Sequence, residues 1–407
     1  MLTRLTALLF LLALQATPAL PATPSPATDP CTNTGSFATW LNDFRAEALA
    51  EGISQKTIDA ALRGITLDAA TISRDRRQGF YWQDFLTFSD RLATTDRITR
   101  GRKKLTSEAA LFLRIETDYG VPASVIAAFW ALESDFGLAM GKFPILRSLA
   151  SLAYDCRRGE MFRTQLMDAL RVIDRGDLKP GEMIGSWAGE LGQMQFLPSH
   201  YFNFGVDYDG NGKRNLLTST PDVVASTAAY LASLGWKKGE PWIEEVRVPA
   251  EMAWHEADLT IRKARKSWSS AGVTTPDGKP LANDDMPAAL LLPMGRHGPA
   301  FLAYANFDIY LEWNQSLNYA ITASYLARRI EGDPAMRRGN GPIPPFGAPE
   351  IEKLQKILLD DGYPVGKVDG KLGANTRAAV REAQLKLKLP ADAYPTPELL
   401  RLLSTGR

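Results

Sequence analysis

The chain has 407 residues, of which 45% are hydrophobic, and its 47 basic and 46 acidic residues leave a formal net charge of +1. This length allows two or three domains with sizeable cores, and the balance of charge gives no reason to expect nucleic acid or an anionic membrane surface as a partner. The three histidines, His200, His255 and His297, are scattered and form no metal-binding spacing such as HExxH.

Residues 1–22 have the features of a secretory signal. Arg4 precedes a mostly apolar run at residues 5–14, and small residues and prolines follow at 16–22. The apolar run is too short to span a bilayer. Cys31 follows an Asp-Pro pair and not a small-residue cleavage site, so we expect no lipid anchor. The sequence therefore predicts an exported, soluble periplasmic protein.

Cys31 and Cys156 are the two cysteines of the chain. In an exported protein an even pair favours a disulfide. We therefore predict the bond Cys31–Cys156, and two unrelated thiols are the alternative.

The region from residue 37 to residue 179 has a helical pattern almost throughout, and its most informative part is the helix expected within residues 121–137. Pro122 suits the first turn of that helix and Gly137 suits its exit. At helical spacing Glu133 shares a face with three apolar residues, Ile126, Phe129 and Trp130.

A carboxyl group on such a face loses water, which favours its protonated form and raises its pKa. A general acid that works near neutral pH needs this property, so Glu133 is a candidate catalytic residue. Asp135 lies on another side of the helix and is a poor partner. The alternative is that Glu133 is partly solvated near a helix end.

A Gly-rich segment follows at residues 185–201, with Ser186, two glutamines and several aromatic residues. Its glycines allow the backbone to approach a ligand closely, and its hydroxyl and amide groups can bond the polar groups of a sugar. The alternative is a tight packing corner between two helices.

Together the two segments resemble the lytic murein transglycosylases of the membrane-bound B type, whose core is lysozyme-like. The resemblance covers about residues 35–332 and depends on the runs Glu133-Ser134-Asp135-Phe136-Gly137 and Gly189-x-x-Gly192-Gln193-x-Gln195-Phe196-x-Pro198-Ser199. It implies that Glu133 is the single catalytic carboxylate. It also implies a set of substrate-binding residues in the cleft: Ser186, Gln193, Gln195, Tyr230, Trp313 and Asn314.

The resemblance implies a non-hydrolytic cleavage of the β-1,4 bond between N-acetylmuramic acid and N-acetylglucosamine in peptidoglycan. Glu133 would protonate the leaving oxygen and then accept the proton of the muramic acid 6-hydroxyl, which closes a 1,6-anhydro ring without any cofactor. No second acid accompanies Glu133 at helical spacing, although Glu190 lies inside the Gly-rich segment. A hydrolytic muramidase of the same fold and a non-catalytic wall-binding scaffold are the alternatives.

Residues 207–215 match the first nine positions of an EF-hand calcium loop. Candidate oxygen ligands are the side chains of Asp207, Asp209, Asn211 and Asn215 and the carbonyl of Lys213. Thr218 stands where a closing Glu is expected, and the resemblance implies that Asp222 closes the site. An Asp/Asn/Gly turn without an ion is the alternative.

The remaining part of the expected catalytic domain, residues 33–332, changes character along the chain. A helix is expected at 221–235, and short alternating runs between turns predict a small antiparallel sheet within 241–314. A last helix is expected at about 316–330. Trp313 stands where the resembling enzymes usually have Tyr, and both it and Tyr230 could equally be ordinary core aromatics.

Five prolines and three glycines at 333–349 predict an interdomain linker without regular structure. Residues 350–407 resemble the three-helix peptidoglycan-binding domain of wall enzymes, although Ala383 stands where an aromatic residue commonly precedes Gln384. A spacer without binding activity is the alternative. The expected fold class is thus mainly α (α+β), with a lysozyme-like helical core, a small β subdomain and a three-helix module.

Overall fold

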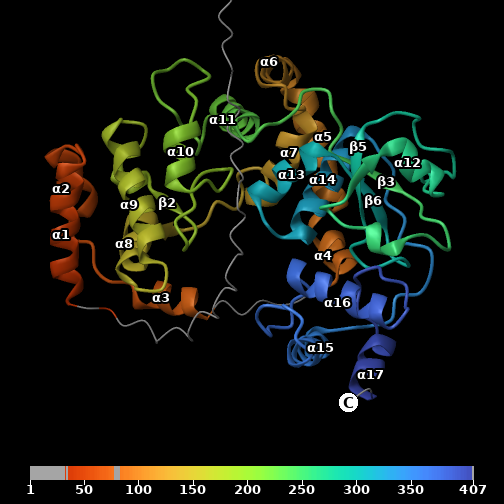
Figure 1. Ribbon diagram of the computed structural model, residues 1–407. Coiled ribbons are helices and arrows are strands. Elements are labelled where there is room, and N and C mark those ends of the chain that lie inside the picture. Colours follow the sequence, from red (N-terminus) through yellow and green to blue (C-terminus); the bar gives the residue numbers. More distant parts are fainter. Residues whose placement is uncertain (1–32, 34, 78–82, 406–407) are drawn as a thin grey trace, which may run out of the picture.

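The computed structural model describes residue 33, residues 35–77 and residues 83–405. In this part the chain is mainly helical and has small antiparallel sheets (Figure 1), which confirms the predicted fold class. The predicted signal at residues 1–22 and Cys31 lie outside the described residues. Within the described ranges, no helix combines the length and the apolar character that a membrane crossing requires.

The described residues up to Ser134 form seven helices: α1 (Phe37–Ala50), α2 (Gln55–Leu62), α3 (Ala69–Arg76), α4 (Phe85–Leu92), α5 (Thr95–Ser107), α6 (Ala109–Tyr119) and α7 (Ala123–Ser134). The first five begin after a Ser, Thr or Asp whose side chain accepts a hydrogen bond from a backbone N–H of the first turn. These caps satisfy donors that have no partner within the helix, so they determine where each helix begins.

Six more helices of at least seven residues follow in the catalytic region: α8 (Ile145–Tyr154), α9 (Gly159–Asp174), α10 (Pro198–Phe204), α11 (Thr220–Ser233), α13 (Ala305–Trp313) and α14 (Leu317–Glu331). Two 3₁₀ turns accompany them, η1 (Pro180–Glu182) and η2 (Trp254–Glu256). Helix α7 packs against α14 and α5, and its residues from Ser124 to Ala131 are all buried. Because its neighbours cover every side of it, α7 is apolar all round instead of amphipathic.

Two separate sheets position the loops of the site. Strand β1 (Phe143–Pro144) pairs with β2 (Ile184–Gly185), which brings the exit of α7 close to the start of the Gly-rich segment. The predicted antiparallel sheet consists of β3 (Ile243–Val246), β4 (Arg262–Ala264), β5 (Pro287–Leu291) and β6 (Ala300–Ala303), in the order β3-β6-β5-β4. With α12 (Arg265–Ser270) it forms a core of its own around the fully buried Trp268.

The C-terminal module contains three helices, α15 (Ala348–Asp360), α16 (Ala374–Lys386) and α17 (Pro397–Thr405). They surround a separate apolar core that includes Phe346, Ile351 and Leu399. Gln355 is buried, and its amide bonds the backbone of the loop at 369–371 and the hydroxyl of Thr376. The module therefore has an apolar core and a buried polar network of its own.

The segment before the module has no helix or strand from Asp333 to Gly347. Helix α15 begins at Ala348, one residue before the predicted linker end at 349, because Pro349 is suited to a first turn and the Glu350 side chain accepts the N–H of Gly347. The segment packs on the catalytic region: the N–H of Asn340 donates to the carbonyl of His297 (2.9 Å).

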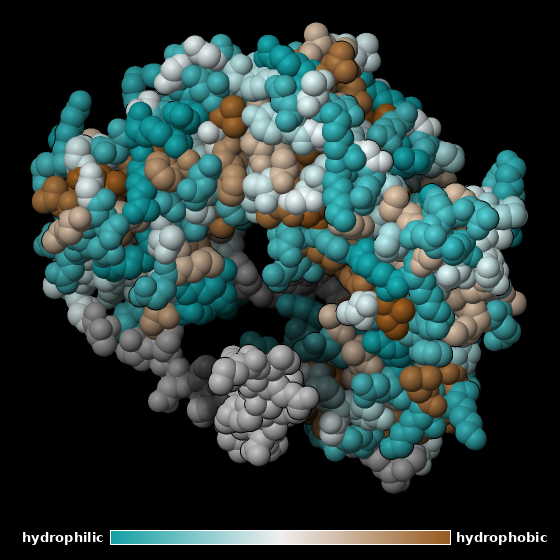
Figure 2. All heavy atoms as spheres, turned by 45° about the horizontal axis from the view of Figure 1, so that its top comes forward, coloured by the Kyte–Doolittle hydropathy of each residue, from teal (hydrophilic) through white to brown (hydrophobic). Residues whose placement is uncertain are grey.

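The module also contacts the β subdomain directly. The Asp392 carboxylate accepts the N–H of Arg296 at 2.9 Å, and Arg377 donates to the carbonyl of Pro293 at 2.6 Å. Arg381 forms an ion pair with Asp258. Helices α1, α2, α8 and α9 lie on one side of the molecule, and α5, α7, α14, the four-stranded sheet and the module lie on the other (Figure 1). The space-filling view shows a hollow between the two sides (Figure 2).

Candidate active site

Glu133 lies in the last turn of α7, where the chain leaves the helix through three residues with positive φ. Asp135, Phe136 and Gly137 have φ values of 55°, 61° and 88°. A Cβ atom at Gly137 would lie 2.7 Å from the Gln193 side chain, so a glycine is required there. The predicted exit of the helix at Gly137 is therefore a close approach between α7 and the Gly-rich segment.

The Glu133 carboxyl group is partly buried and receives two hydrogen bonds on the same oxygen. Trp313 Nε1 at the end of α13 donates to Oε1 at 2.8 Å. The hydroxyl of Tyr319, in the first turn of α14, also donates to Oε1. Three helices therefore meet at this carboxyl group.

Burial raises the pKa of Glu133 from 4.5 to about 7. The hydrogen bonds from Tyr319 and Trp313 oppose this shift because they favour the charged form, and the charge of Glu190 adds to it. A carboxyl group with this pKa is present in both protonation states near neutral pH, as a group that donates and then accepts a proton requires.

Asp135 has different partners. It forms ion pairs with Arg97 (3.2 Å) and Arg100 of α5. Burial tends to raise its pKa, but the hydrogen bonds from the two guanidinium groups outweigh burial and lower it. Asp135 is thus held ionised by α5.

Aromatic rings line the site next to Glu133. Trp313 stacks on Phe129, with ring centroids 4.3 Å apart. The rings of Phe196 and Tyr230 lie 5.7 Å and 5.6 Å from Trp313, and Tyr230 is 8% exposed. The two residues named from the sequence, Tyr230 and Trp313, are therefore brought together beside the carboxyl group.

Ser186 and Glu190 face each other inside the Gly-rich segment. The Ser186 hydroxyl donates to Glu190 Oε2 at 2.8 Å. Burial raises the pKa of Glu190, while the hydrogen bond from Ser186 and the charge of Arg158 lower it in part. The structure thus places a second carboxyl group close enough to influence Glu133.

The two glutamines of the segment have protein partners. Gln193 accepts from Trp130 Nε1 at 2.8 Å and donates to the carbonyl of Leu217 at 2.9 Å. Gln195 donates to the carbonyls of Met140 and Gly192 and has a φ of 48°. Both amides hold the segment in shape.

Asn314, also named from the sequence, follows α13 directly. Its side-chain oxygen accepts the N–H of Ser316 at 2.9 Å. This bond fixes the turn between α13 and α14, the two helices that supply Trp313 and Tyr319.

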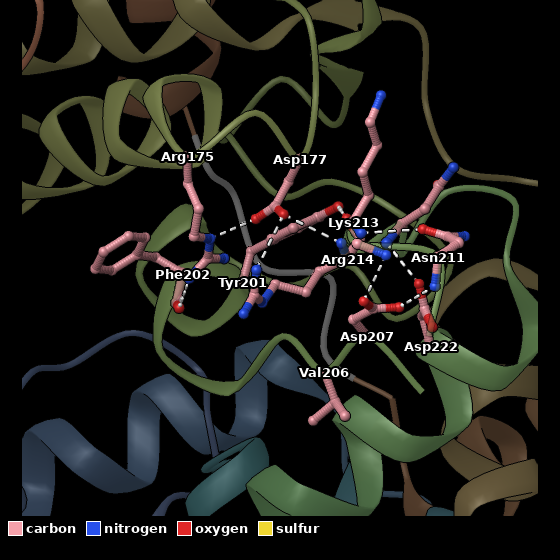
Figure 3. Close-up of polar contacts among 12 residues, drawn as sticks. Arg175, Asp177, Tyr201, Phe202, Val206, Asp207, Asn211, Lys213, Arg214 and Asp222 are labelled. Carbon is pink, nitrogen blue, oxygen red and sulfur yellow. Dashed lines mark hydrogen bonds and ion pairs between the residues drawn. The ribbon is translucent and has the colours of Figure 1, made fainter. Parts of the chain in front are cut away.

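Three carboxylates of the predicted metal loop converge. Ligand atoms of Asp207, Asp209 and Asp222 all lie within 4.8 Å of one another. Asp222 is fully buried in the first turn of α11, and burial raises its pKa. The Asp222 carboxylate accepts the N–H groups of Tyr208 (2.8 Å) and Asn215 (2.8 Å), so the loop is folded around it (Figure 3).

The other predicted ligands take part in the turn itself. Asn211 Oδ1 accepts the N–H of Lys213 at 3.0 Å. Asn215 Oδ1 accepts the N–H groups of Leu217 and Thr218 at 3.0 Å each, and its Nδ2 donates to the Thr218 hydroxyl. A fourth acidic residue, Asp177, accepts the N–H of Arg214 at 3.1 Å and ties the loop to the end of α9.

Tyr319 and the role of the Trp313 indole were missed in the sequence analysis. The available signal was weak: Tyr319 is a tyrosine in the first turn of the expected last helix, six residues after Trp313. Its importance follows from the packing of α14 against α7.

Comparison with known proteins agrees with this geometry. Residues 36–328 match the family described as "Transglycosylase SLT domain", and residues 347–403 match "Putative peptidoglycan binding domain". The membrane-bound lytic murein transglycosylase B of Escherichia coli (strain K12) is 28% identical over 289 residues, which are 70% of this chain and 78% of that protein.

Two solved structures extend the comparison. SltB3 from Pseudomonas aeruginosa, in complex with NAG-anhNAM-pentapeptide, is 40% identical, with a TM-score of 0.85 and coverage of 91% of this chain and 99% of the other. The Escherichia coli lytic transglycosylase Slt35 in complex with calcium is 25% identical, with a TM-score of 0.60 and coverage of 72% and 92%. The chain therefore belongs to the transglycosylase SLT domain family and is a lytic transglycosylase.

Proposed function

We propose that this enzyme cleaves the β-1,4 bond between N-acetylmuramic acid and N-acetylglucosamine in peptidoglycan and leaves 1,6-anhydromuramic acid ends. The observation that supports this most directly is the Glu133 carboxyl group, whose pKa is raised to about 7 and which two neighbouring helices hold in place. The relative that is 40% identical was solved with an anhydro-muropeptide.

In the proposed reaction Glu133 is first an acid and then a base. Trp313 and Tyr319 both donate to Oε1, so the proton of the acid form belongs on Oε2. Oε2 gives this proton to the leaving glycosidic oxygen and then accepts the proton of the muramic acid 6-hydroxyl. That hydroxyl oxygen attacks the anomeric carbon and closes the 1,6-anhydro ring, so no water enters the product.

The residues around Glu133 have proposed roles in binding the sugars. Tyr230 and Trp313 offer aromatic faces, and Gln195 and Asn314 offer polar groups at the edges. The Ser186 hydroxyl donates to Glu190 and shapes the loop beside them. We assign Gln193 to the support of the site, because its side chain joins α7 to the carbonyl of Leu217.

A hydrolytic muramidase is the second candidate, and the observation that favours it is that the charge of Glu190 acts on Glu133 and raises its pKa. A glycosidase that hydrolyses its substrate usually has two catalytic carboxyl groups. Mass spectrometry of the muropeptides released from purified sacculi separates the two reactions, because an anhydro end and a reducing end differ by one water. Reducing ends as the main product would overturn the transglycosylase assignment.

We propose that Asp207, Asp209 and Asp222 hold a calcium ion, together with oxygens of Asn211, Lys213 and Asn215. Three converging carboxylates suit this hard cation, and a related enzyme was solved with calcium. The ion would neutralise the carboxylates and stabilise the loop, and it has no part in the proton transfers.

Calcium is therefore expected to raise the melting temperature. A hundredfold excess over Kd adds about 2.7 kcal/mol to the free energy of unfolding, which corresponds to a few degrees in a protein of this size. Differential scanning calorimetry in calcium and in chelator measures the shift. Asp207→Asn is the control and should abolish most of it. Equal melting temperatures in calcium and chelator would show that the loop is a turn without an ion.

We propose that the C-terminal module binds peptidoglycan and that the enzyme acts in the periplasm. The match to a peptidoglycan-binding domain supports the first part. Binding to the wall raises the local enzyme concentration without any new contact in the cleft. The predicted boundaries of the catalytic domain (33–332), linker (333–349) and module (350–407) belong to this proposal, and Phe346 in the module core favours a module that begins slightly earlier.

Removal of the module is expected to slow the digestion of insoluble sacculi and to leave the digestion of soluble glycan fragments nearly unchanged. A chain that ends at Pro342 retains the catalytic region and lacks the whole module core. Turnover on both substrates, with calorimetry to verify folding, measures the effect. An equal rate on sacculi would mean that the module is a spacer.

The disulfide Cys31–Cys156 remains our prediction, since Cys31 lies outside the described residues. Asn33, two residues after Cys31, accepts the backbone N–H of Cys156 at 2.8 Å, which supports the pairing. Peptide mapping of the exported protein without reductant is expected to yield a cross-linked pair of peptides. Two free thiols in that experiment would refute the bond.

A further inference from the structure

The loop that carries Ser186 is closed upon itself. The N–H of Ser186 donates to the carbonyl of Glu190 at 2.8 Å, and Gly185 forms an antiparallel bridge with Leu191. A Cβ atom at Gly185 would lie 2.1 Å from the Glu190 carbonyl oxygen, so the two ends of the loop are in close contact. These backbone contacts therefore fix the position of the Glu190 Cα atom relative to Ser186.

Every hydrogen-bonding position of the Ser186 hydroxyl is used inside this loop. The oxygen accepts the N–H groups of Ala188 (3.1 Å) and Glu190 (3.2 Å), and the hydroxyl proton is donated to Glu190 Oε2 (2.8 Å). A hydroxyl has one donor and two acceptor positions. An ionised Glu190 can only accept, so it determines the direction of the Ser186 O–H bond.

The charge of the Glu190 carboxylate also raises the pKa of Glu133. The other groups that face Glu133 are Trp313 from α13 and Tyr319 from α14. The nearest acid on α7 itself, Asp135, forms ion pairs with Arg97 and Arg100 of α5. The charge of Arg97 also tends to lower the pKa of Tyr319.

The charge of Glu190 is only partly compensated. Arg158, the N-cap residue of α9, is the cation that acts on it. The guanidinium group of Arg158 is in an ion pair with the buried Asp75, which is 1% exposed. Arg158 is therefore shared between Asp75 and Glu190, and the charge of Glu190 still raises the pKa of Glu133.

We propose that Glu190 is a positioning residue of this reaction: its carboxylate holds the Ser186 hydroxyl in one orientation and keeps a second negative charge near Glu133. The proposal rests on the proposed role of Glu133 as acid and base. A nearby negative charge favours the protonated form of Glu133, the form in which each turnover begins. Glu190 thus extends the pH range of activity on the alkaline side without taking part in a proton transfer to the sugar.

Glu190→Gln and Glu190→Ala separate the two effects. Gln keeps an acceptor oxygen for Ser186 and removes the charge, so the rate at the optimum should stay within about threefold, and the alkaline limb of kcat/KM should move down by about half a pH unit to one unit. Ala removes both the charge and the acceptor oxygen. The alkaline limb should therefore move by the same amount, and kcat should fall by a further factor of about ten, which corresponds to one lost hydrogen bond. The pH profile is measured on a soluble glycan fragment.

Glu160→Gln, an exposed acid in the first turn of α9, is the matched control for charge removal and should leave the profile in place. An alkaline limb that does not move in Glu190→Gln would overturn the proposal. If the Ala variant does not fold, titration of the Glu133 carboxyl by NMR in the Gln variant provides the same comparison. The proposed function fails separately, if the wild type releases no anhydro product or if Glu133→Gln remains active.

Discussion

Glu133→Gln is expected to reduce turnover by at least ~10²–10⁴-fold, the range typical of the loss of general acid–base catalysis. Gln is nearly the same size and can still accept the hydrogen bonds from Trp313 and Tyr319. It cannot donate a proton to the leaving oxygen or accept one from the 6-hydroxyl. Release of anhydromuropeptides from sacculi, followed by mass spectrometry, measures the loss.

The stability of this variant has a defined pH dependence. The pKa of Glu133 is raised from 4.5 to about 7 in the folded protein, so the folded state binds this proton more tightly than the unfolded chain does. The resulting stabilisation is fully present below about 4.5 and is lost as pH rises through about 7. Glu133→Gln lacks this dependence and should be relatively more stable than wild type above pH ~7.

Substantial anhydromuropeptide release by a well-folded Glu133→Gln protein would mean that the catalytic acid is misassigned. Glu190 would then be the next candidate, because it is the other carboxyl group with a raised pKa beside the Gly-rich loop. Calorimetry of the variant serves as the folding control.

Tyr319→Phe is expected to move the alkaline limb of the pH–rate profile upward. The Tyr319 hydroxyl donates to Glu133 Oε1 and favours the charged form, so its loss should raise the pKa of Glu133 above about 7. One hydrogen bond to a charged group corresponds to a shift of about one unit. Turnover should also fall about 10-fold to 100-fold, because the carboxylate is less well stabilised and less well oriented.

Tyr325→Phe is the matched control on the same helix. Its hydroxyl accepts the N–H of Met336 at 3.3 Å and makes no contact with Glu133 among the hydrogen bonds of the described residues. This variant should retain the wild-type profile. An unchanged or lowered limb in Tyr319→Phe would contradict the proposed role of the hydroxyl.

Several features of the site could be predicted from the sequence because they depend on residues close together in the chain. The spacing of Glu133 from Ile126, Phe129 and Trp130 predicts a desolvated carboxyl group, and its raised pKa agrees with this. The alternation of Asp207, Asp209 and Asn211 predicts a loop whose oxygens point inward, and two of its carboxylates converge with Asp222. The helical fold class and the antiparallel sheet also follow from local periodicity.

Contacts between distant segments could not be predicted in this way. Trp313 was considered as a surface for a sugar, and its indole N–H proved to be a hydrogen-bond donor to Glu133, 180 residues earlier. Tyr319 reaches the same oxygen from 186 residues away. Such pairs depend on the packing of α13 and α14 against α7, and no spacing along one helix encodes that packing.

In the C-terminal part, too, the sequence determines local conformation and the tertiary structure determines the contacts between segments. Its proline- and glycine-rich sequence determines that residues 333–347 form no helix or strand, since these residues cannot maintain regular hydrogen bonding. The sequence did not determine whether this segment and the module pack against the catalytic region. Tertiary contacts decide this, such as those of Arg377 with the carbonyl of Pro293 and of Asp392 with Arg296. The physical reason is that local sequence determines the conformation of each segment, whereas the pairing of surfaces far apart in the chain depends on the folded shape of both.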